Sequence, residues 1–308
     1  MDEAKYRDAE AHLWGTLHVE PTERMVPLAV TGTRVRVQEV GGGPPVIFIH
    51  GGPNSGTTWA EMVTQMPDFR CLMVDRPGTG LSERADLSLE NFVRFCERFV
   101  GDLLDGLGLE HAHVVASSLG GCIALRSAST APERLDRMVQ MACPAFVPGM
   151  ATPMFMRLMG LGPVRALLNV IKPSDRSNRS IMRQIGHGAS LDKGLISQDF
   201  MDWYLALGRY TDTMRNEGEL IGKASGLRGF DTSMTMPDDV FRAVTTPTYF
   251  WWGADDAFGS EEVARHVVDL MPRAELQMVP ESGHLPWLDN PTRAAEIARA
   301  FLRSAADQ

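Results

Sequence analysis

The sequence predicts an α/β protein in which a mostly parallel sheet is flanked by helices and carries an inserted all-helical cap. Short, continuous apolar runs, such as residues 46–49, are typical of strands that are buried on both faces. Stretches with apolar residues at helical spacing, such as residues 89–107, alternate with these runs, and this alternation favours parallel strands joined by crossover helices. Residues 145–244 differ, because they contain helical patterns and no convincing buried strand.

Each element can be placed from these patterns. Residues 1–23 are expected to form a polar helical lead-in, followed by a β-hairpin at 24–28 and 34–40. The expected buried strands are 46–49, 71–74, 113–116, 135–142, 248–252 and 276–279. The expected helices of the core are 89–107, 120–130, 260–271 and 291–305. The predicted core comprises residues 1–144 and 245–308, and the cap comprises residues 145–244 with helices at 154–171 and 200–220.

Composition excludes several classes of function. The chain has 308 residues, 44% of them hydrophobic, which is enough to bury a sizeable core. A net charge of −9 argues against nucleic acid as a partner, since a nucleic-acid binder is expected to carry a basic face. The charged N-terminus is unlike a signal peptide, and the apolar runs are too short to cross a bilayer, so we expect a cytoplasmic protein.

The cysteines indicate neither a metal site nor a disulfide framework. Cys71, Cys96, Cys122 and Cys143 lie in apolar segments, with no CxxC pair and no His/Cys spacing of the metal-binding kind. Buried free thiols in a reducing compartment are therefore expected. The sequence predicts no cofactor and no metal.

A strand that runs directly into a helix at residues 114–121 carries the candidate nucleophile, Ser118. The residues at positions 116 and 120 are small, as a sharp turn requires, and such a turn strains its central residue and lifts that side chain above the sheet. The start of the helix supplies free N–H groups and partial positive charge, which suit a developing oxyanion. The alternative is an ordinary helix capped by a serine, a role that Ser117 alone could fill.

His284 and Asp256 are the candidate base and acid. A serine hydroxyl is a weak nucleophile until a base takes its proton, and His284 follows the last predicted strand in a loop at the sheet edge. Other histidines, including His187, lie on polar segments and are expected at the surface. The imidazole needs an acceptor on its second nitrogen, and of the two carboxylates that follow strand 248–252 we favour Asp256 over Asp255.

The sequence HGGP at 50–53 supplies the fourth part of the predicted site, directly after strand 46–49. Glycines allow the backbone to approach a substrate, so the N–H groups of Gly52 and Leu119 are the predicted oxyanion-hole donors. His50 is expected to hold this loop rather than to act as a second base. Residues 75–82 are expected to shape the sheet edge and have no assigned chemistry.

Together these motifs resemble the α/β-hydrolase superfamily over nearly the whole chain. They are HGGP at 50–53, DRPGTGLS at 75–82, SSLGG at 117–121, WGADD at 252–256 and SGHLPWLDNP at 282–291. The resemblance implies a catalytic triad of Ser118, Asp256 and His284 and a cap over the sheet edge. Ala116 stands where the family usually has glycine. A serine nucleophile argues against the haloalkane dehalogenase and epoxide hydrolase branches, which need a carboxylate there.

The predicted function is hydrolysis of a small-molecule carboxylic ester, lactone or thioester through an acyl-enzyme on Ser118. The same triad also serves amide, C–C bond and perhydrolase chemistry, and a ligand receptor that keeps this fold is the alternative from another class. The HGGP motif is similar to that of proline iminopeptidases, but those carry GGSWG and DQRG where this chain has ASSLG and DRPG. Glu217 and Glu219 are expected to be solvated helix charges. The methionines of the cap favour either a flexible apolar pocket or simple packing of the cap on itself.

Overall fold

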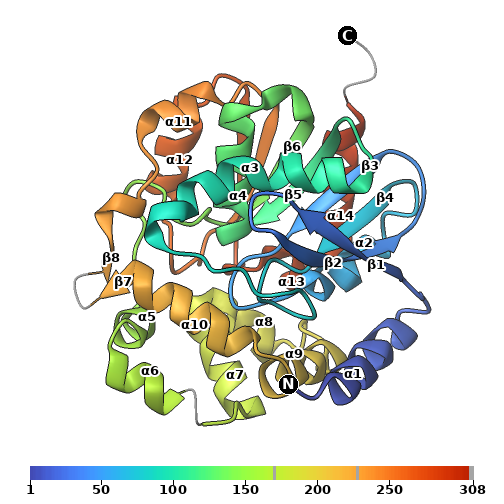
Figure 1. The fold of residues 1–308 in the computed structure, drawn as a ribbon, viewed down its shortest axis with the longest axis vertical. Coiled ribbons are helices and arrows are strands. Elements are labelled where there is room, and N and C mark those ends of the chain that lie inside the picture. The colour runs from blue at the N-terminus through green and yellow to red at the C-terminus, as the bar shows by residue number, and fades with distance from the viewer. Residues whose placement is uncertain (169–170, 227–228, 305–308) are drawn as a thin grey trace.

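An eight-stranded sheet organises the chain in the computed structural model, which describes residues 1–168, 171–226 and 229–304 (Figure 1). The strands are β1 (Thr22–Leu28), β2 (Thr33–Val40), β3 (Pro45–Ile49), β4 (Arg70–Val74), β5 (Ala112–Ser117), β6 (Leu135–Met141), β9 (Thr248–Gly253) and β10 (Ala274–Val279). Their order across the sheet is β1-β2-β4-β3-β5-β6-β9-β10. All pairs from β4 to β10 are parallel, whereas β2 is antiparallel to both β1 and β4. The predicted mostly parallel sheet is confirmed.

Helices cover both faces of the sheet, which explains why its central strands are apolar throughout. Helices α3 (Leu89–Leu107) and α4 (Leu119–Thr130) pack on each other over one face, and α2 (Ala60–Val63) and α14 (Pro291–Arg303) pack together on the other (Figure 1). Helix α12 (Glu261–Leu270) packs on β10. The amphipathic α3 begins at a capping box made by Ser88 and Asn91 and ends at Gly108, whose φ of +70° suits glycine.

The N-terminal segment is tied to the sheet by a buried ion pair. Helix α1 (Glu3–Thr16) is shorter than the predicted lead-in, because the chain becomes extended at β1. One face of α1 is buried, and its Glu10 accepts hydrogen bonds from both Nη atoms of Arg36 on β2, at 3.0 and 2.6 Å. The same helix packs on α9 (Gln198–Tyr210), so it joins the sheet to the region described next.

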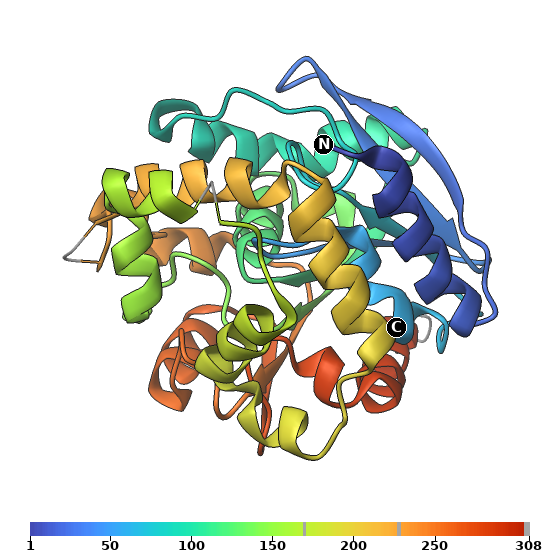
Figure 2. The same ribbon diagram turned by 90° about the horizontal axis from the view of Figure 1, so that it is seen from below.

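Between β6 and β9 the chain forms a helical insertion, residues 154–234. Its elements are α5 (Met154–Met159), α6 (Gly162–Leu168), α7 (Asp175–Met182), the π-helical turn η3 (Arg183–His187), α8 (Gly188–Asp192), α9, α10 (Thr213–Ala224), a small ribbon of β7 (Ser225–Gly226) and β8 (Gly229–Phe230), and η4 (Thr232–Met234). Figure 1 shows these helices gathered with α1 at the lower end of the molecule, and Figure 2 shows them from below. Apart from that ribbon, the regular elements in the described part of the insertion are helical.

Two long helices predicted in this region are each divided in the structure. The segment predicted as helix 154–171 contains α5 and α6, separated at Gly160, and residues 169–170 of that prediction lie outside the described residues. The segment predicted as helix 200–220 contains α9 and α10. The break falls at Thr211, which is extended and whose hydroxyl bonds the carbonyl of Leu207 at 2.6 Å, so the side chain competes with the helical backbone pattern.

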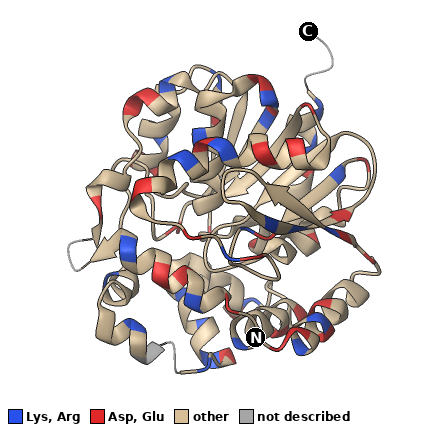
Figure 3. Ribbon diagram, in the orientation of Figure 1, with Lys and Arg blue, Asp and Glu red and all other residues tan. Residues whose placement is uncertain are grey.

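The remaining elements adjoin the core. Helix α11 (Asp238–Ala243) packs on α4 and α12, and α13 (Pro286–Asp289) packs on α14. All four cysteines are buried free thiols, as predicted. Acidic and basic residues alternate along much of the chain, as the coloured ribbon of Figure 3 shows. Within the described residues, none of the helices combines the length and the apolar character needed to cross a membrane.

Candidate active site

Ser118 stands at the turn between β5 and α4, with φ of 51° and ψ of −118°. This positive φ is strained for a residue with a side chain, and such strain persists only where the surroundings enforce it. Gly120 is one of those surroundings, because a Cβ there would collide with the backbone carbonyl of Ile49. The N-cap position of α4 is Ser118 itself, and its side chain makes no capping hydrogen bond. The Ser117 hydroxyl is buried without a partner in the described chain, so neither serine acts as an ordinary helix cap.

The structure brings Asp256, and not Asp255, to His284. Nδ1 of His284 lies 2.9 Å from both carboxylate oxygens of Asp256, and the two side chains are almost completely buried. Backbone N–H groups of Cys143 and Phe258 also donate to this carboxylate, at 3.0 and 2.9 Å. Because the carboxylate only accepts, His284 carries its proton on Nδ1, and Nε2 remains free to accept one. Asp255 is exposed to solvent.

The loop after β3 approaches Ser118 through its backbone. A Cβ on Gly51 would lie 2.6 Å from Cβ of Ser118, so only glycine fits at this contact. Gly52 and Leu119 line the same cavity as Ser118. Leu119 is the first residue of α4, so its N–H belongs to the helix-terminal donors that have no partner within the helix.

His50 stabilises the loop that contains Gly51 and Gly52. The backbone N–H of Arg76 donates to Nε2 of His50 at 3.2 Å, so Nδ1 carries the proton and donates to the carbonyl of Gly51 at 2.6 Å. Burial, together with the nearby Arg76 guanidinium, lowers the pKa of His50 well below its usual range. A neutral, fully hydrogen-bonded imidazole agrees with the structural role expected for His50.

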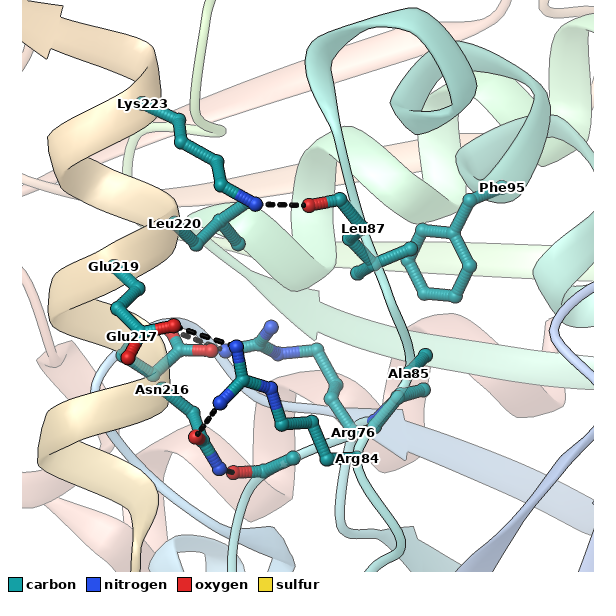
Figure 4. Close-up of a pocket in the computed structure, with 12 residues that line it drawn as sticks. Arg76, Arg84, Ala85, Leu87, Phe95, Asn216, Glu217, Glu219, Leu220 and Lys223 are labelled. Carbon is teal, nitrogen blue, oxygen red and sulfur yellow. Dashed lines mark hydrogen bonds and ion pairs between the residues drawn. The ribbon is translucent and has the colours of Figure 1, made fainter.

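Arg76 and Glu217 form a buried ion pair that the sequence did not indicate. Nη2 of Arg76 donates to Oε2 of Glu217 at 2.9 Å, and the two side chains are 3% and 4% exposed. The same guanidinium donates to the carbonyls of His50 and Gly51, at 3.0 and 3.1 Å. The expectation of a solvated Glu217 was wrong, because α10 lies directly over the loop that contains Arg76 (Figure 4).

Further contacts fix α10 over this loop. Asn216 donates to the carbonyl of Gly78 at 2.8 Å, and Lys223 donates to the carbonyl of Leu87 at 2.9 Å (Figure 4). Glu219, also expected to be solvated, is half-buried and pairs with Arg84 at 2.5 Å. The helix that covers the Gly51–Gly52 loop is therefore held by polar contacts along its length.

A cavity of about 580 Å³ borders Ser118, Leu119, Gly52 and His284. Its other walls come mainly from the helical insertion and are largely apolar, with Phe146, Phe155 and Phe230 among them. Residues 145–244, the predicted cap, contain nine methionines, and six of them line this cavity: Met150, Met156, Met159, Met182, Met214 and Met234. The sequence left open whether these methionines form an apolar pocket or pack the cap on itself. Most of them line a pocket.

His187 is fully buried, contrary to the surface position expected for it. Glycines flank it in the sequence, and the turn η3 packs against the loop that contains His284. The contacts made there include a hydrogen bond from the N–H of Leu285 to Nε2 of His187 at 2.9 Å. No local pattern in the sequence distinguishes this histidine from the exposed ones.

Comparison with known proteins places the chain in a family. A sequence model of the alpha/beta hydrolase family matches residues 46–297, which include Ser118, Asp256 and His284. The chain belongs to the alpha/beta hydrolase family. This agrees with the resemblance inferred from its motifs.

Proteins similar to this alpha/beta hydrolase include a C–C bond hydrolase and a carboxylesterase. A 2-hydroxy-6-oxononadienedioate/2-hydroxy-6-oxononatrienedioate hydrolase of Burkholderia vietnamiensis is 26% identical, over 93% of this chain and 98% of that protein. Carboxylesterase CesB of Bacillus subtilis superimposes with a TM-score of 0.75 at 20% identity, over 98% of this chain and 99% of the other. The meta-cleavage product hydrolase CumD of Pseudomonas fluorescens superimposes with a TM-score of 0.73 at 21% identity, over 92% and 98%. The two superpositions show the same fold, and the relative found by sequence supports hydrolase activity.

The described part of this hydrolase contains no candidate metal site. Across residues 1–168, 171–226 and 229–304, no three His, Cys, Asp or Glu side chains come together in a group suited to a metal ion.

Proposed function

We propose that this alpha/beta hydrolase cleaves carboxylic esters through an acyl-enzyme on Ser118. The observation that carries the proposal is the strained Ser118 at the wall of a largely apolar cavity that it shares with His284, whose Nδ1 is held by Asp256. Lactones and thioesters present the same reacting carbonyl and belong to the same proposal.

In the first step, Nε2 of His284 takes the proton of the Ser118 hydroxyl as its oxygen attacks the ester carbonyl carbon. The N–H groups of Gly52 and Leu119 stabilise the oxyanion of the tetrahedral intermediate, and a donor of this kind is typically worth about 3 kcal/mol. The intermediate collapses when the C–O bond to the alcohol breaks and His284 protonates the departing alkoxide. Asp256 stabilises the imidazolium that exists between these proton transfers.

The second step returns the enzyme to its starting state. His284 takes a proton from water, the resulting hydroxide attacks the acyl carbon, and the acid leaves as Ser118 recovers its proton. The methionine and phenylalanine side chains around the cavity support an apolar acyl or alcohol group as the bulk of the substrate, because thioether side chains adapt to varied shapes.

The test uses serine and aspartate pairs in which one member of each is a control. Ser118→Ala is expected to abolish turnover of p-nitrophenyl butyrate and labelling by a fluorophosphonate, whereas Ser117→Ala is expected to retain both. Asp256→Asn is expected to lower kcat about 10⁴-fold. Asp255→Asn, at an exposed position, is expected to leave kcat unchanged. Wild-type turnover by Ser118→Ala would contradict the proposal.

Hydrolysis of a C–C bond beside a ketone is a second candidate, favoured by the 26% identical relative from Burkholderia vietnamiensis. In that chemistry the carbonyl attacked belongs to a ketone, and the group that leaves is a carbanion that must be delocalised and protonated. Loss of the absorbance of 2-hydroxy-6-oxo-6-phenylhexa-2,4-dienoate measures it directly. Turnover of this dienoate without turnover of any p-nitrophenyl ester would replace the ester proposal with this one.

A further inference from the structure

The turn η3 packs backbone against backbone on the loop that contains His284, which we call the histidine loop (residues 282–285). Gly186, at φ +101°, has no room for a Cβ, because one would collide with the carbonyl of Asp255 and lie 2.9 Å from Cα of Gly283. A Cβ on Gly283 would in turn lie 2.6 Å from the carbonyl carbon of Gly186. The backbones of η3 and the histidine loop are therefore in direct contact, and both contact positions require glycine.

Three consecutive N–H groups of the histidine loop are held by defined acceptors. The N–H of Gly283 donates to Oδ2 of Asp289 at 3.1 Å. The N–H of His284 donates to the carbonyl of Ile185 at 2.9 Å, and the N–H of Leu285 donates to Nε2 of His187 at 2.9 Å. Two of these three acceptors belong to η3, which is part of the helical insertion rather than the sheet.

The hydrogen bonds of His187 fix its protonation. A backbone N–H can only donate, so Nε2 of His187 carries no proton and Nδ1 carries one. Nδ1 then donates to Oδ1 of Asp289 at 2.8 Å. Protonation of Nε2 would set two donors against each other at Leu285. The imidazole is therefore neutral and held in one tautomer while it joins Leu285 to Asp289.

Asp289 connects the remaining parts of this network. Its Oδ2 also accepts a hydrogen bond from the hydroxyl of Ser282 at 2.5 Å. Burial alone would raise the pKa of Asp289, but the hydrogen bonds from His187 and its other partners hold that pKa below the ordinary value. An ionised Asp289 accepts from the start of the histidine loop and from His187, so it closes a ring of contacts around His284.

We propose that His187 is a positioning residue, which aligns His284 by holding the N–H of Leu285 and the carboxylate of Asp289. This inference rests on the proposed role of His284 as the general base. The side chain of His187 is fully buried, so it acts through the histidine loop and not through contact with a substrate. Its removal should therefore reduce the chemical step and leave substrate binding nearly intact.

The principal test compares His187→Ala with His187→Gln in the full-length protein. His187→Ala is expected to lower kcat for p-nitrophenyl butyrate, and the rate of fluorophosphonate labelling of Ser118, by about 10- to 100-fold, with KM within about twofold. His187→Gln keeps a donor and an acceptor and is expected to recover most of this loss. Imidazole added to His187→Ala, whose substitution leaves space for it, is expected to raise kcat again. His111→Ala, at an exposed histidine, is the control.

The assays are run well below the melting temperature of each variant, so a loss of folded protein is not mistaken for a loss of alignment. A folded His187→Ala with wild-type kcat and labelling rate, or with an effect confined to KM, would overturn the proposal. The tautomer is tested without any variant, since ¹⁵N NMR of the wild-type protein should find the His187 proton on Nδ1. A proton on Nε2 would also overturn it.

Failure of the proposed function gives a different result. In that case the wild-type protein does not hydrolyse the ester, whether or not Ser118 reacts with the fluorophosphonate. The downfield proton resonance of Nδ1 in His284, which reports its hydrogen bond to Asp256, then remains as the measurement. Broadening or loss of this resonance in His187→Ala supports the positioning role, and an unchanged resonance refutes it.

Discussion

Replacing Glu217 should weaken the fold far more than replacing Glu219, two residues away on the same helix. Glu217→Ala leaves the guanidinium of Arg76 buried without its counter-ion, and removing one partner of a buried pair typically costs about 3–5 kcal/mol. Arg76 keeps two carbonyl acceptors, so we expect the lower end, about 3 kcal/mol. Glu219 pairs with Arg84 at the surface, where both side chains are at least one third exposed, and its loss should cost under about 0.5 kcal/mol.

These energies translate into melting temperatures that calorimetry can resolve. An unfolding entropy of about 2.1 cal/mol/K per residue, over 308 residues, gives a shift of about 1.5 °C for each kcal/mol. Glu217→Ala should therefore melt about 5 °C below the wild type, and Glu219→Ala within about 1 °C of it. Equal melting temperatures for the two variants would refute the energetic importance of the buried pair.

Glu217→Ala should also affect the loop that contains the proposed oxyanion-hole donor. Arg76 donates to the carbonyls of His50 and Gly51, directly before the proposed donor Gly52. With Glu217 absent, only these two carbonyls hold the guanidinium, so the loop before Gly52 is less rigidly supported. We expect kcat to fall in Glu217→Ala, while Glu219→Ala keeps wild-type kcat. Glu217→Gln retains an acceptor and should lie between the two in both measurements.

The other predictions concern the sheet and its helices. Burial raises the pKa of Asp75 to about 6 from 3.8, so its protonation stabilises the fold below about pH 4, and this contribution is lost as the pH rises through 6. Urea unfolding measures the free energy of unfolding, and the excess of wild type over Asp75→Asn in this quantity should grow by about 2 kcal/mol from pH 7 to 4.5. A difference that does not change with pH would contradict the raised pKa of Asp75. Gly101→Ala, in an open part of α3, should stabilise by about 0.5–1 kcal/mol, whereas Gly120→Ala should destabilise strongly; thermal melts that rank them otherwise would be inconsistent with the packing. Burial raises the pKa of Cys71 to about 12 and that of Cys143 well above its usual value. These two thiols should therefore resist alkylation in the native protein and react in the denatured protein, as mass spectrometry can measure.

Local sequence was sufficient to place the candidate residues that lie directly after strands. Ser118 and His284 each lie in a short string whose small residues are required by backbone contacts, such as the collision that a Cβ at Gly120 would cause. The choice of Asp256 over Asp255 rested on which neighbour faces inward, and the structure buries Asp256 beside His284 while Asp255 stays exposed. Alternation of apolar strands and amphipathic helices likewise predicted the sheet.

Local sequence patterns did not predict contacts between residues that are far apart in the chain. Arg76 and Glu217 are 141 positions apart, and a glutamate on an amphipathic helix is usually solvated, so only the packing of α10 over the loop explains its burial. His187 lies between two glycines with no apolar periodicity around it, and it is buried because Gly186 lets η3 approach the histidine loop. The breaks at Gly160 and Thr211 were missed because apolar spacing continues across them.

The hydrogen bonds between η3 and the histidine loop also limit how this enzyme can be re-engineered. Exchanging residues 154–234 for the corresponding segment of a relative is an obvious way to alter which substrates fit, since that segment forms most of the cavity wall. The exchange would also remove Ile185 and His187, which hold the backbone on either side of the His284 side chain. A chimaera that keeps residues 183–187 and exchanges the rest would separate a change in specificity from a loss of catalytic power.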